Sequence, residues 1–221
     1  MVLETSELPV LVAIVGPTAT GKSTLAIKVA QRFNGEVVSC DSTAVYKGFD
    51  IGTDKVPMSA RQGIPHHLID VVDGSCYYSA AQYARDAKVA IENITERGRL
   101  PILVGGSGLY YRALTRGLFD GPGRDDQIRT RLTRIAGRRG VEYLHRLVGR
   151  VDPASAKRIQ QRDQKRLIRA LEVYYLTGRP LTDHFDSTRS PIDAYHVIPF
   201  ALHLAAEEIS RRVKDLSLIH I

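Results

Sequence analysis

The hydrophobic positions at the start of the chain form first a continuous run and then a helical pattern. Residues 9–15 (PVLVAIV) are apolar and rich in β-branched side chains, which is typical of a strand buried inside a parallel sheet. Residues 23–33 instead place apolar side chains three and four positions apart, as an amphipathic helix does. Both patterns recur downstream, and strands that alternate with helices predict an α/β fold with a parallel sheet. The predicted elements of this core are strands over 9–15, 36–40 and 100–104 and helices over 23–33 and 78–97.

The pattern changes after the Gly-Pro-Gly sequence at 121–123, where strands no longer alternate with helices. Each apolar-periodic segment from there to Gly178 predicts a helix, and strand character returns only after Ser190. We therefore expect an all-helical insertion within one α/β core. The predicted helices cover 125–136, 140–148, 153–161, 163–177 and 206–215, and the predicted strand covers 195–204. The expected segments are the first part of the core (1–120), the insertion (121–192), the return to the core (193–215) and a tail that looks foreign (216–221).

The net charge of +7 is concentrated in the predicted insertion. Residues 124–190 hold fourteen Arg and two Lys against eight acidic residues, whereas the rest of the chain is close to neutral. Because clustered basic side chains displace counterions from phosphates, this block predicts a polyanionic partner. The alternative is that Arg-rich helices are simply well solvated.

Other features exclude several classes of protein. No apolar run approaches the roughly 18 residues that span a bilayer, and the first nine residues lack a basic secretory region. Cys40 and Cys76 are too few for a disulfide framework and lack metal-ligand spacing. His66 and His67 are adjacent on an extended segment and would point to opposite faces, which argues against a shared metal. We expect a soluble cytoplasmic protein with reduced thiols.

Residues 16–23 (GPTATGKS) match the sequence G-x-x-x-x-G-K-[ST] at every fixed position, between a predicted strand and a predicted helix. Glycines there let backbone N–H groups face a phosphate at a helix N-terminus, Lys22 adds a positive charge, and the Ser23 hydroxyl can ligate Mg²⁺. The motif predicts a P-loop NTPase-like core with a di- or triphosphate site, but it does not identify the reaction. The expected diphosphate-binding residues are Gly16, Pro17, Thr18, Ala19, Thr20, Gly21, Lys22, Ser23 and Thr24.

Two further polar positions follow predicted strands. Asp41 follows the second strand at the carboxyl edge of the sheet, where open α/β folds bind ligands, so it could bind Mg²⁺ through water or take a proton. The third strand ends in 105–108 (GGSG) without the carboxylate that nucleotide hydrolases use, and Ser107 is its candidate for contact with an anion. The alternatives are that Asp41 and Ser42 only cap the next segment and that 105–108 is only a flexible turn.

Together these stretches closely resemble the bacterial tRNA dimethylallyltransferases, also called tRNA isopentenyltransferases. The resemblance runs from about residue 10 to about residue 202. Its most specific part is DSTAVYKGFDIGTDK from Asp41, because this sequence after a P-loop is not a general NTPase pattern. The other matching stretches are GPTATGKS at 16, PHHLID at 65, YSAAQY at 78, LPILVGGSGLYYRAL at 100 and DQKRLIRALEVYYLTGRPL at 163.

The resemblance implies transfer of a dimethylallyl group from dimethylallyl diphosphate to N6 of adenine 37 in tRNAs that read codons beginning with U. The P-loop would hold the diphosphate with Mg²⁺ on Ser23, Asp41 would accept the N6 proton, and Lys22 and Ser107 would complete the catalytic set. The adenine would leave its stack to enter the pocket. The residues expected to contact the tRNA anticodon stem-loop are Asp41, Ser42, Thr43, Ala44, Ser107, Arg129, Lys165, Arg166, Leu167, Ile168 and Arg169.

The chain departs from the family at its end, where the family's G-Y-R-Q and K-R-Q-x-T-W segments are missing. We therefore expect a C-terminally truncated, monomeric chain that by itself is inactive or nearly so in prenyl transfer. A P-loop small-molecule kinase is the first alternative, and it predicts thermal protection by ATP but not by dimethylallyl diphosphate. A prenyltransferase of free adenine nucleotides fits the basic insertion poorly. A non-catalytic RNA-binding fragment predicts tRNA retention without diphosphate affinity.

Overall fold

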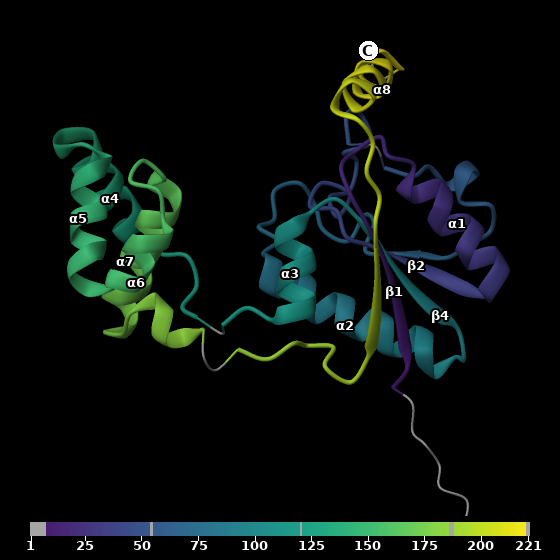
Figure 1. Ribbon diagram of the computed structural model, residues 1–221, viewed down its shortest axis with the longest axis horizontal. Coiled ribbons are helices and arrows are strands. Elements are labelled where there is room, and N and C mark those ends of the chain that lie inside the picture. The colour runs from purple at the N-terminus through teal and green to yellow at the C-terminus, as the bar shows by residue number, and fades with distance from the viewer. Residues whose placement is uncertain (1–7, 54, 120, 186–187, 220–221) are drawn as a thin grey trace, which may run out of the picture. The chain divides into compact units, whose positions relative to one another are not determined.

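The computed structural model divides the chain into two compact units (Figure 1). Unit 1 comprises residues 1–117 and 190–221, and unit 2 comprises residues 118–189. The insertion expected from the sequence, 121–192, therefore differs from unit 2 by three residues at each end. The described residues are 8–53, 55–119, 121–185 and 188–219, without the side chains of 216–219.

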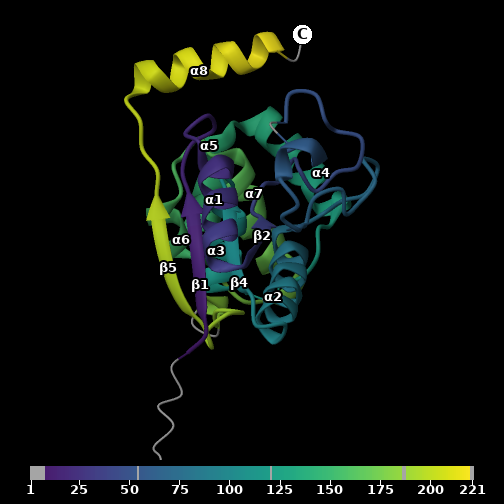
Figure 2. The ribbon, with the colours of Figure 1, turned by 90° about the vertical axis from the view of Figure 1, so that its right-hand side faces the viewer.

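Unit 1 is built on a five-stranded sheet in its described residues. The strands are β1 (Val10–Val15), β2 (Gly35–Ser39), β3 (His66–His67), β4 (Leu100–Gly105) and β5 (His196–Ala201). Their order is β3-β2-β4-β1-β5, and every neighbouring pair is parallel, as the common direction of β1 and β5 shows in Figure 2. This arrangement confirms the predicted α/β class. Because parallel strands end at the same edge of a sheet, the loops after β1, β2 and β4 leave it together.

Helices cover both faces of the sheet: α1 (Lys22–Phe33) lies on one face, and α2 (Ala80–Glu96) and α3 (Gly108–Arg116) lie on the other (Figure 1). Alternate residues of β1 serve the two faces, because side chains of a strand point to opposite sides. Ile14 packs with α1, whereas Leu11 packs with α2 and α3. Burial of each such aliphatic side chain stabilises the fold by roughly 1.5–3 kcal/mol.

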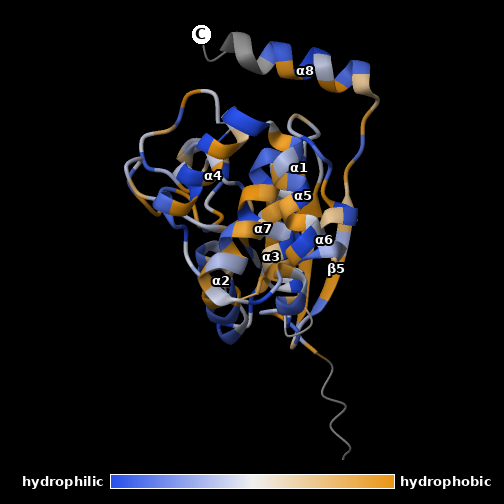
Figure 3. Cartoon of the chain, turned by 90° about the vertical axis from the view of Figure 1, so that its left-hand side faces the viewer, coloured by the Kyte–Doolittle hydropathy of each residue, from blue (hydrophilic) through white to orange (hydrophobic). Residues whose placement is uncertain are grey.

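Unit 2 is entirely helical in its described residues, and each helix carries both hydrophobic and hydrophilic positions (Figure 3). Its helices are α4 (Asp126–Arg139), α5 (Val141–Val151), α6 (Pro153–Arg158) and α7 (Gln164–Thr177). Aspartates cap three of them, since Asp125, Asp152 and Asp163 each accept a hydrogen bond from a first-turn N–H group. Such caps stabilise a helix by about 1 kcal/mol each. The core of the unit is formed by Leu132, Ala136, Leu144, Val148, Leu167, Ile168, Ala170 and Leu171.

The remaining elements are short or terminal. They are the 3₁₀ turns Met58–Arg61 and Leu181–His184 and the helix α8 (Ala206–Ile219). The tail expected to be foreign, 216–221, continues α8 in its backbone as far as Ile219, and residues 220 and 221 lie outside the described residues. None of the helices in the described part of the chain combines the length and apolar character that crossing a membrane requires.

The sequence patterns missed α3. The structure shows that the glycine stretch 105–108 is a turn of only a few residues, and that a helix begins at Gly108 itself. Tyr110 and Leu114 lie four residues apart on the buried side of this helix, where the Tyr110 ring stacks on Tyr83 with centroids 4.2 Å apart. The predicted strand 195–204 was also too long, because β5 ends at Ala201.

Candidate active site at the carboxyl edge of the sheet

The loop between β1 and α1 depends on left-handed backbone conformations. Gly16 has φ of 150°, Ala19 of 66° and Gly21 of 86°. A Cβ atom at Gly16 would lie 2.5 Å from the backbone oxygen of Leu202, so only glycine fits there. Gly21 is the N-cap of α1 and has no side chain to cap the helix, which leaves the first-turn N–H groups for an anion. The local fold is therefore that of a phosphate-binding loop.

Two side chains of this loop converge on the backbone oxygen of Pro17. Thr20 Oγ1 donates to it at 2.9 Å, and Lys22 Nζ donates to it at 2.5 Å. Lys22 and Ser23 occupy the first two positions of α1, so that the ammonium and the hydroxyl lie beside the positive end of the helix. These groups could hold a diphosphate.

Asp41 follows β2 and organises the next loop through its Oδ1 atom. This oxygen accepts hydrogen bonds from Thr43 N at 2.8 Å, Thr43 Oγ1 at 2.7 Å and Ala44 N at 3.4 Å. The capping role considered from the sequence is therefore real for this oxygen. The other carboxylate oxygen has no hydrogen-bond partner among the described residues, so Asp41 retains an acceptor for a ligand.

Ser107 ties the loop after β4 to the loop after β2. Its Oγ accepts from Ser42 N at 2.9 Å and donates to Ser42 Oγ at 3.2 Å, and its N–H donates to Cys40 O at 3.1 Å. The close approach requires Gly105, because a Cβ atom there would lie only 2.0 Å from Cys40 O. Ser107 is thus a partner of the Asp41 loop in the structure, and the glycine at position 105 is a packing requirement.

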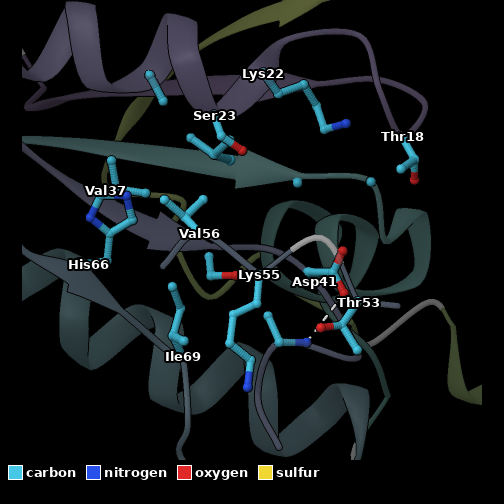
Figure 4. A pocket seen from close by; sticks show the side chains of 16 residues that line it. Thr18, Lys22, Ser23, Val37, Asp41, Thr53, Lys55, Val56, His66 and Ile69 are labelled. Carbon is cyan, nitrogen blue, oxygen red and sulfur yellow. Dashed lines mark hydrogen bonds between the residues drawn. The ribbon is translucent and has the colours of Figure 1, made fainter. Parts of the chain in front are cut away.

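A cavity of about 80 Å³ brings the predicted residues together (Figure 4). Lys22 and Ser23 lie on one side of it and Asp41 on another. A shallower hollow of about 410 Å³ shares Asp41 with this cavity and is also lined by Ser107. The apolar part of the lining of the smaller cavity is formed by Ala26, Val37, Val56, Ile69 and Val104.

Lys55 is a cavity residue to which the sequence patterns assigned no role. Its side chain is only 5% exposed, and its Nζ donates to Asp50 at 2.8 Å and to Asp70 at 2.7 Å. Burial alone would lower the pKa of this ammonium, but the two carboxylates outweigh it and raise the pKa above its ordinary value. The sequence shows a lysine and an aspartate in DIGTDK (50–55) and a further aspartate at the end of PHHLID (65–70). Only the three-dimensional structure shows that Lys55 pairs with both Asp50 and Asp70.

The two adjacent histidines have separate environments. His66 is half-buried in the cavity, its Nδ1 lies 2.8 Å from Ile64 O, and burial lowers its pKa. His67 Nε2 lies 2.6 Å from the buried Glu36, which Arg97 and Arg99 also bind. Metal binding by the pair was judged improbable from the sequence, and the structure gives each ring a different partner.

In unit 2, two arginines expected to contact tRNA bind a buried carboxylate. Glu172 is fully buried and accepts from Arg129 Nε at 2.7 Å, Arg129 Nη2 at 2.8 Å and Arg169 Nη1 at 2.8 Å. Asp125 N donates a further bond at 2.9 Å. Burial favours the neutral acid, but the two guanidinium groups outweigh it and lower the pKa of Glu172 to about 2. The first role of both arginines is therefore to stabilise unit 2.

The predicted tRNA-binding residues at the start of α7 differ in the exposure of their side chains. Lys165 and Arg166 are exposed, whereas Leu167 is fully buried and Ile168 is 6% exposed. The side chains of Leu167 and Ile168 pack in the core of unit 2, so the predicted contact of these residues with tRNA would have to come from their backbone. The helical period could have predicted this difference, because residues three or four positions apart share a face of a helix. Leu167 and Ile168 share the face that also carries Leu171 in the core of unit 2.

For a metal ion, the cavity offers oxygen ligands and no cluster of acidic or imidazole groups. No group of three His, Cys, Asp or Glu residues able to hold a metal occurs in the parts of the chain that the structure describes. Ser23 Oγ and the Asp41 carboxylate line the same cavity. This donor set fits a hard cation that takes most of its ligands from phosphate oxygens and water.

Comparison with known proteins gives the same family from both sequence and structure. A model described as IPP transferase matches residues 44–216. The tRNA dimethylallyltransferase of Solibacter usitatus is 49% identical over 87% of this chain and 62% of that protein, and that of Methylococcus capsulatus is 44% identical over 97% and 70%. The structure of a eukaryotic dimethylallyltransferase acting on tRNA aligns with a TM-score of 0.74 and 29% identity, over 96% of this chain and 55% of that one.

The chain spans about two thirds of the length of these bacterial relatives. The family model nevertheless matches most of the chain, including the Asp41 loop from Ala44 onward, the Ser107 loop and all of unit 2. The family predicted from the sequence is confirmed, and the chain belongs to the IPP transferase family.

Proposed function

We propose that the protein transfers a dimethylallyl group from dimethylallyl diphosphate to N6 of adenine 37 in the anticodon stem-loop of tRNA. The observation that carries the proposal is that Lys22, Ser23 and Asp41 line one cavity. The reaction needs groups that hold a diphosphate and a carboxylate that takes a proton, and this cavity offers both. The names of the relatives, tRNA dimethylallyltransferases, supply the substrate class.

In the proposed reaction, N6 of the adenine forms a bond to C1 of the prenyl group while the bond from C1 to the diphosphate oxygen breaks. Negative charge develops on the leaving diphosphate, where Lys22 and the first N–H groups of α1 stabilise it. The N6 proton goes to the unpartnered oxygen of Asp41, which leaves a neutral secondary amine as product. Ser107 supports this step by holding Ser42 N, next to Asp41.

Mg²⁺ fits the donor set of the cavity. Ser23 Oγ would hold the ion together with oxygens of the diphosphate, and Asp41 could hold it through water. When bound, the ion would add positive charge beside the leaving group.

The acceptor side of the proposal rests on unit 2 and on the Asp41 loop. The exposed Lys165 and Arg166 at the start of α7 would bind tRNA phosphates. Ser42 and Thr43 line the shallower hollow beside Asp41 and would lie against the flipped nucleotide. Arg129 and Arg169 would act on tRNA mainly by keeping unit 2 folded.

The first test is binding, measured by calorimetry in the presence of Mg²⁺. The chain is expected to bind dimethylallyl diphosphate more tightly than ATP. Transfer of a radiolabelled dimethylallyl group to an unmodified anticodon stem-loop is then measured for the chain, and for the chain extended by the C-terminal third of the Methylococcus capsulatus relative. Asp41→Asn should slow transfer in the extended protein by about 10²–10⁴-fold without changing diphosphate affinity.

Asp73→Asn is the matched control for Asp41→Asn, because Asp73 is an exposed aspartate whose only ion pair is a 3.6 Å contact with Lys47 in the described residues. Its transfer rate should equal that of the unsubstituted protein. Tight binding of ATP without affinity for dimethylallyl diphosphate would replace the proposal with a kinase. Retention of tRNA without affinity for either diphosphate would leave an RNA-binding module.

A further inference from the structure

The buried ammonium of Lys55 uses all of its hydrogen-bonding capacity within the protein. An ammonium has three donors. Nζ donates to Tyr46 O at 2.9 Å, to Asp50 Oδ1 at 2.8 Å and to Asp70 Oδ1 at 2.7 Å. These partners belong to separate stretches of the loops on either side of β3. An isolated parallel bridge between Tyr46 and Val72 already pairs the two stretches, and the ammonium adds a charged link beside it.

A chain of hydrogen bonds leads from this ammonium to Asp41. Asp70, held by Lys55, donates through its N–H to Ala44 O at 3.0 Å. Ala44 in turn donates through its N–H to Asp41 Oδ1 at 3.4 Å. The backbone around Ala44 is therefore held by Asp41 on one side and by Asp70 on the other.

The Asp70 end of this chain has a backbone conformation that surrounding contacts must hold, and backbone bonds from Asp70 and Val71 to Ala44 and Val45 are among these contacts. Leu68 and Asp70 both have left-handed backbone conformations, with φ of 60° and 58°. Residues other than glycine keep such conformations only when their surroundings hold them. The ion pair between Lys55 and the Asp70 carboxylate is the charged contact that helps to hold Asp70 in this conformation.

Lys55 does not reach the predicted leaving group. Its side chain contributes to the wall of the cavity, but in Figure 4 its nitrogen points away from Lys22 and from Asp41. A direct contact between this ammonium and a diphosphate on the P-loop would also require it to leave two carboxylates. Its action on the site is through the loops it joins.

We propose that Lys55 is a positioning residue that fixes the orientation of Asp41 by clamping Asp50, Asp70 and the backbone oxygen of Tyr46. The catalytic part of this proposal rests on the proposed function, in which Asp41 takes the N6 proton. The structural part rests only on the chain of hydrogen bonds that runs from Lys55 to Asp70, from Asp70 to Ala44 and from Ala44 to Asp41.

The test replaces Lys55 by Met, which keeps the length of the side chain and removes the charge. Amide hydrogen exchange is measured by NMR in the 221-residue chain. Exchange at Thr43 and Ala44, whose N–H groups bind Asp41, should accelerate by about tenfold or more. Exchange at Cys40, whose N–H binds Val104 O inside the sheet, should stay within about twofold.

Two other lysine variants separate charge from bulk. Lys55→Arg keeps a cation and should restore most of the protection. Lys88→Met is the matched control, because Lys88 is an exposed lysine whose only ion pair within the described part of the chain is a 3.6 Å contact with Glu92. It should change nothing. If Lys55→Met does not fold, Asp70→Asn removes the same bridge and should give the same local pattern.

Transfer is measured for the same variants in the extended protein. Lys55→Met should lower the rate at saturating substrates by about 10–100-fold, the range typical when a residue that orients a reacting group is lost, with the dissociation constant for dimethylallyl diphosphate unchanged within about twofold. An equal loss of affinity would mean that the P-loop is disturbed, and it would overturn the proposal.

The outcomes also separate this inference from the proposed function. Unchanged exchange at Thr43 and Ala44, or a uniform rise across the sheet, would overturn the positioning role of Lys55. Full transfer activity of Asp41→Asn would overturn the proposed function instead. In that case the exchange pattern of Lys55→Met would still decide whether the clamp exists.

Discussion

Replacing Glu172 by Gln tests how far one buried charge stabilises unit 2. The pKa of Glu172 lies at about 2 in the folded protein against an ordinary value of 4.5, because two arginines and a backbone N–H group bind its carboxylate. A shift of this size corresponds to about 3 kcal/mol of stability. Both arginine side chains are about 30% exposed, so solvent screening reduces this to an expected loss of about 2–3 kcal/mol for Glu172→Gln.

The pH dependence has a definite sign. Because folding lowers the pKa of Glu172, its contribution is fully present above about pH 4.5 and is lost as the pH falls toward 2. The difference in stability between the unsubstituted chain and Glu172→Gln should therefore be largest at neutral pH. It should shrink by roughly half by pH 3.

The assay is urea unfolding followed by the methyl NMR signals of Leu144 and Leu167, which lie in the core of unit 2 and report on it alone. Glu142→Gln is the matched control, because the Glu142 side chain is 45% exposed and its one ion pair among the described residues is a 3.2 Å contact with Arg162. It should leave the urea midpoint nearly unchanged. Equal midpoints for Glu172→Gln and the unsubstituted chain at pH 7, or a difference that is independent of pH, would refute the reasoning.

Three further predictions concern unit 1. Gly105→Ala should lower the free energy of unfolding by about 1–3 kcal/mol in thermal melts, since its Cβ would lie 2.0 Å from Cys40 O, while Gly108→Ala, with open space at that position, should not. Lys22→Met should weaken calorimetric binding of dimethylallyl diphosphate by about 10–100-fold, with Lys28→Met on the exposed side of the same helix as control. Iodoacetamide at pH 8 should label the exposed Cys76 but not Cys40, because burial raises the pKa of the Cys40 thiol to about 12 and leaves it protonated. Peptide mass spectrometry measures the labelling, and a Cys40 adduct would contradict the prediction.

The sequence predicted the parts of the fold that depend on local patterns. The strand before Gly16 and the helix from Lys22 were found within one residue, because an apolar run and a helical period are properties of the segment itself. The helix α3 was missed because glycines at 105–108 indicate a turn, and only the packing of Tyr110 and Leu114 against α2 and the sheet identifies the helix that follows.

In the candidate site, too, the features that depend on a local pattern were predicted and those that depend on packing were not. A motif within one segment predicted the P-loop, and the edge rule for parallel sheets predicted that Asp41 would lie near it. The clamp of Lys55 on Asp50 and Asp70 depends on how three loop segments meet, and no spacing in the sequence encodes this. Similarly, counting basic residues could not separate the exposed Lys165 from Arg129, whose guanidinium is committed to a buried glutamate.

Unit 2 lies between α3 and β5 in the sequence, and this order affects how the protein folds while it is being synthesised. One edge of β1 pairs with β4, but its other edge pairs only with β5, which the ribosome makes after the whole of unit 2. β4 ends at Gly105 and β5 at Ala201, so at about 5–20 residues per second the delay between them is on the order of 5–20 s. During that time the nascent core presents an unpaired strand edge to other chains, whereas the helices of unit 2 make mostly local contacts and can fold at once. Among the described residues, the last strand to be synthesised, β5, therefore covers the open edge of the first, β1.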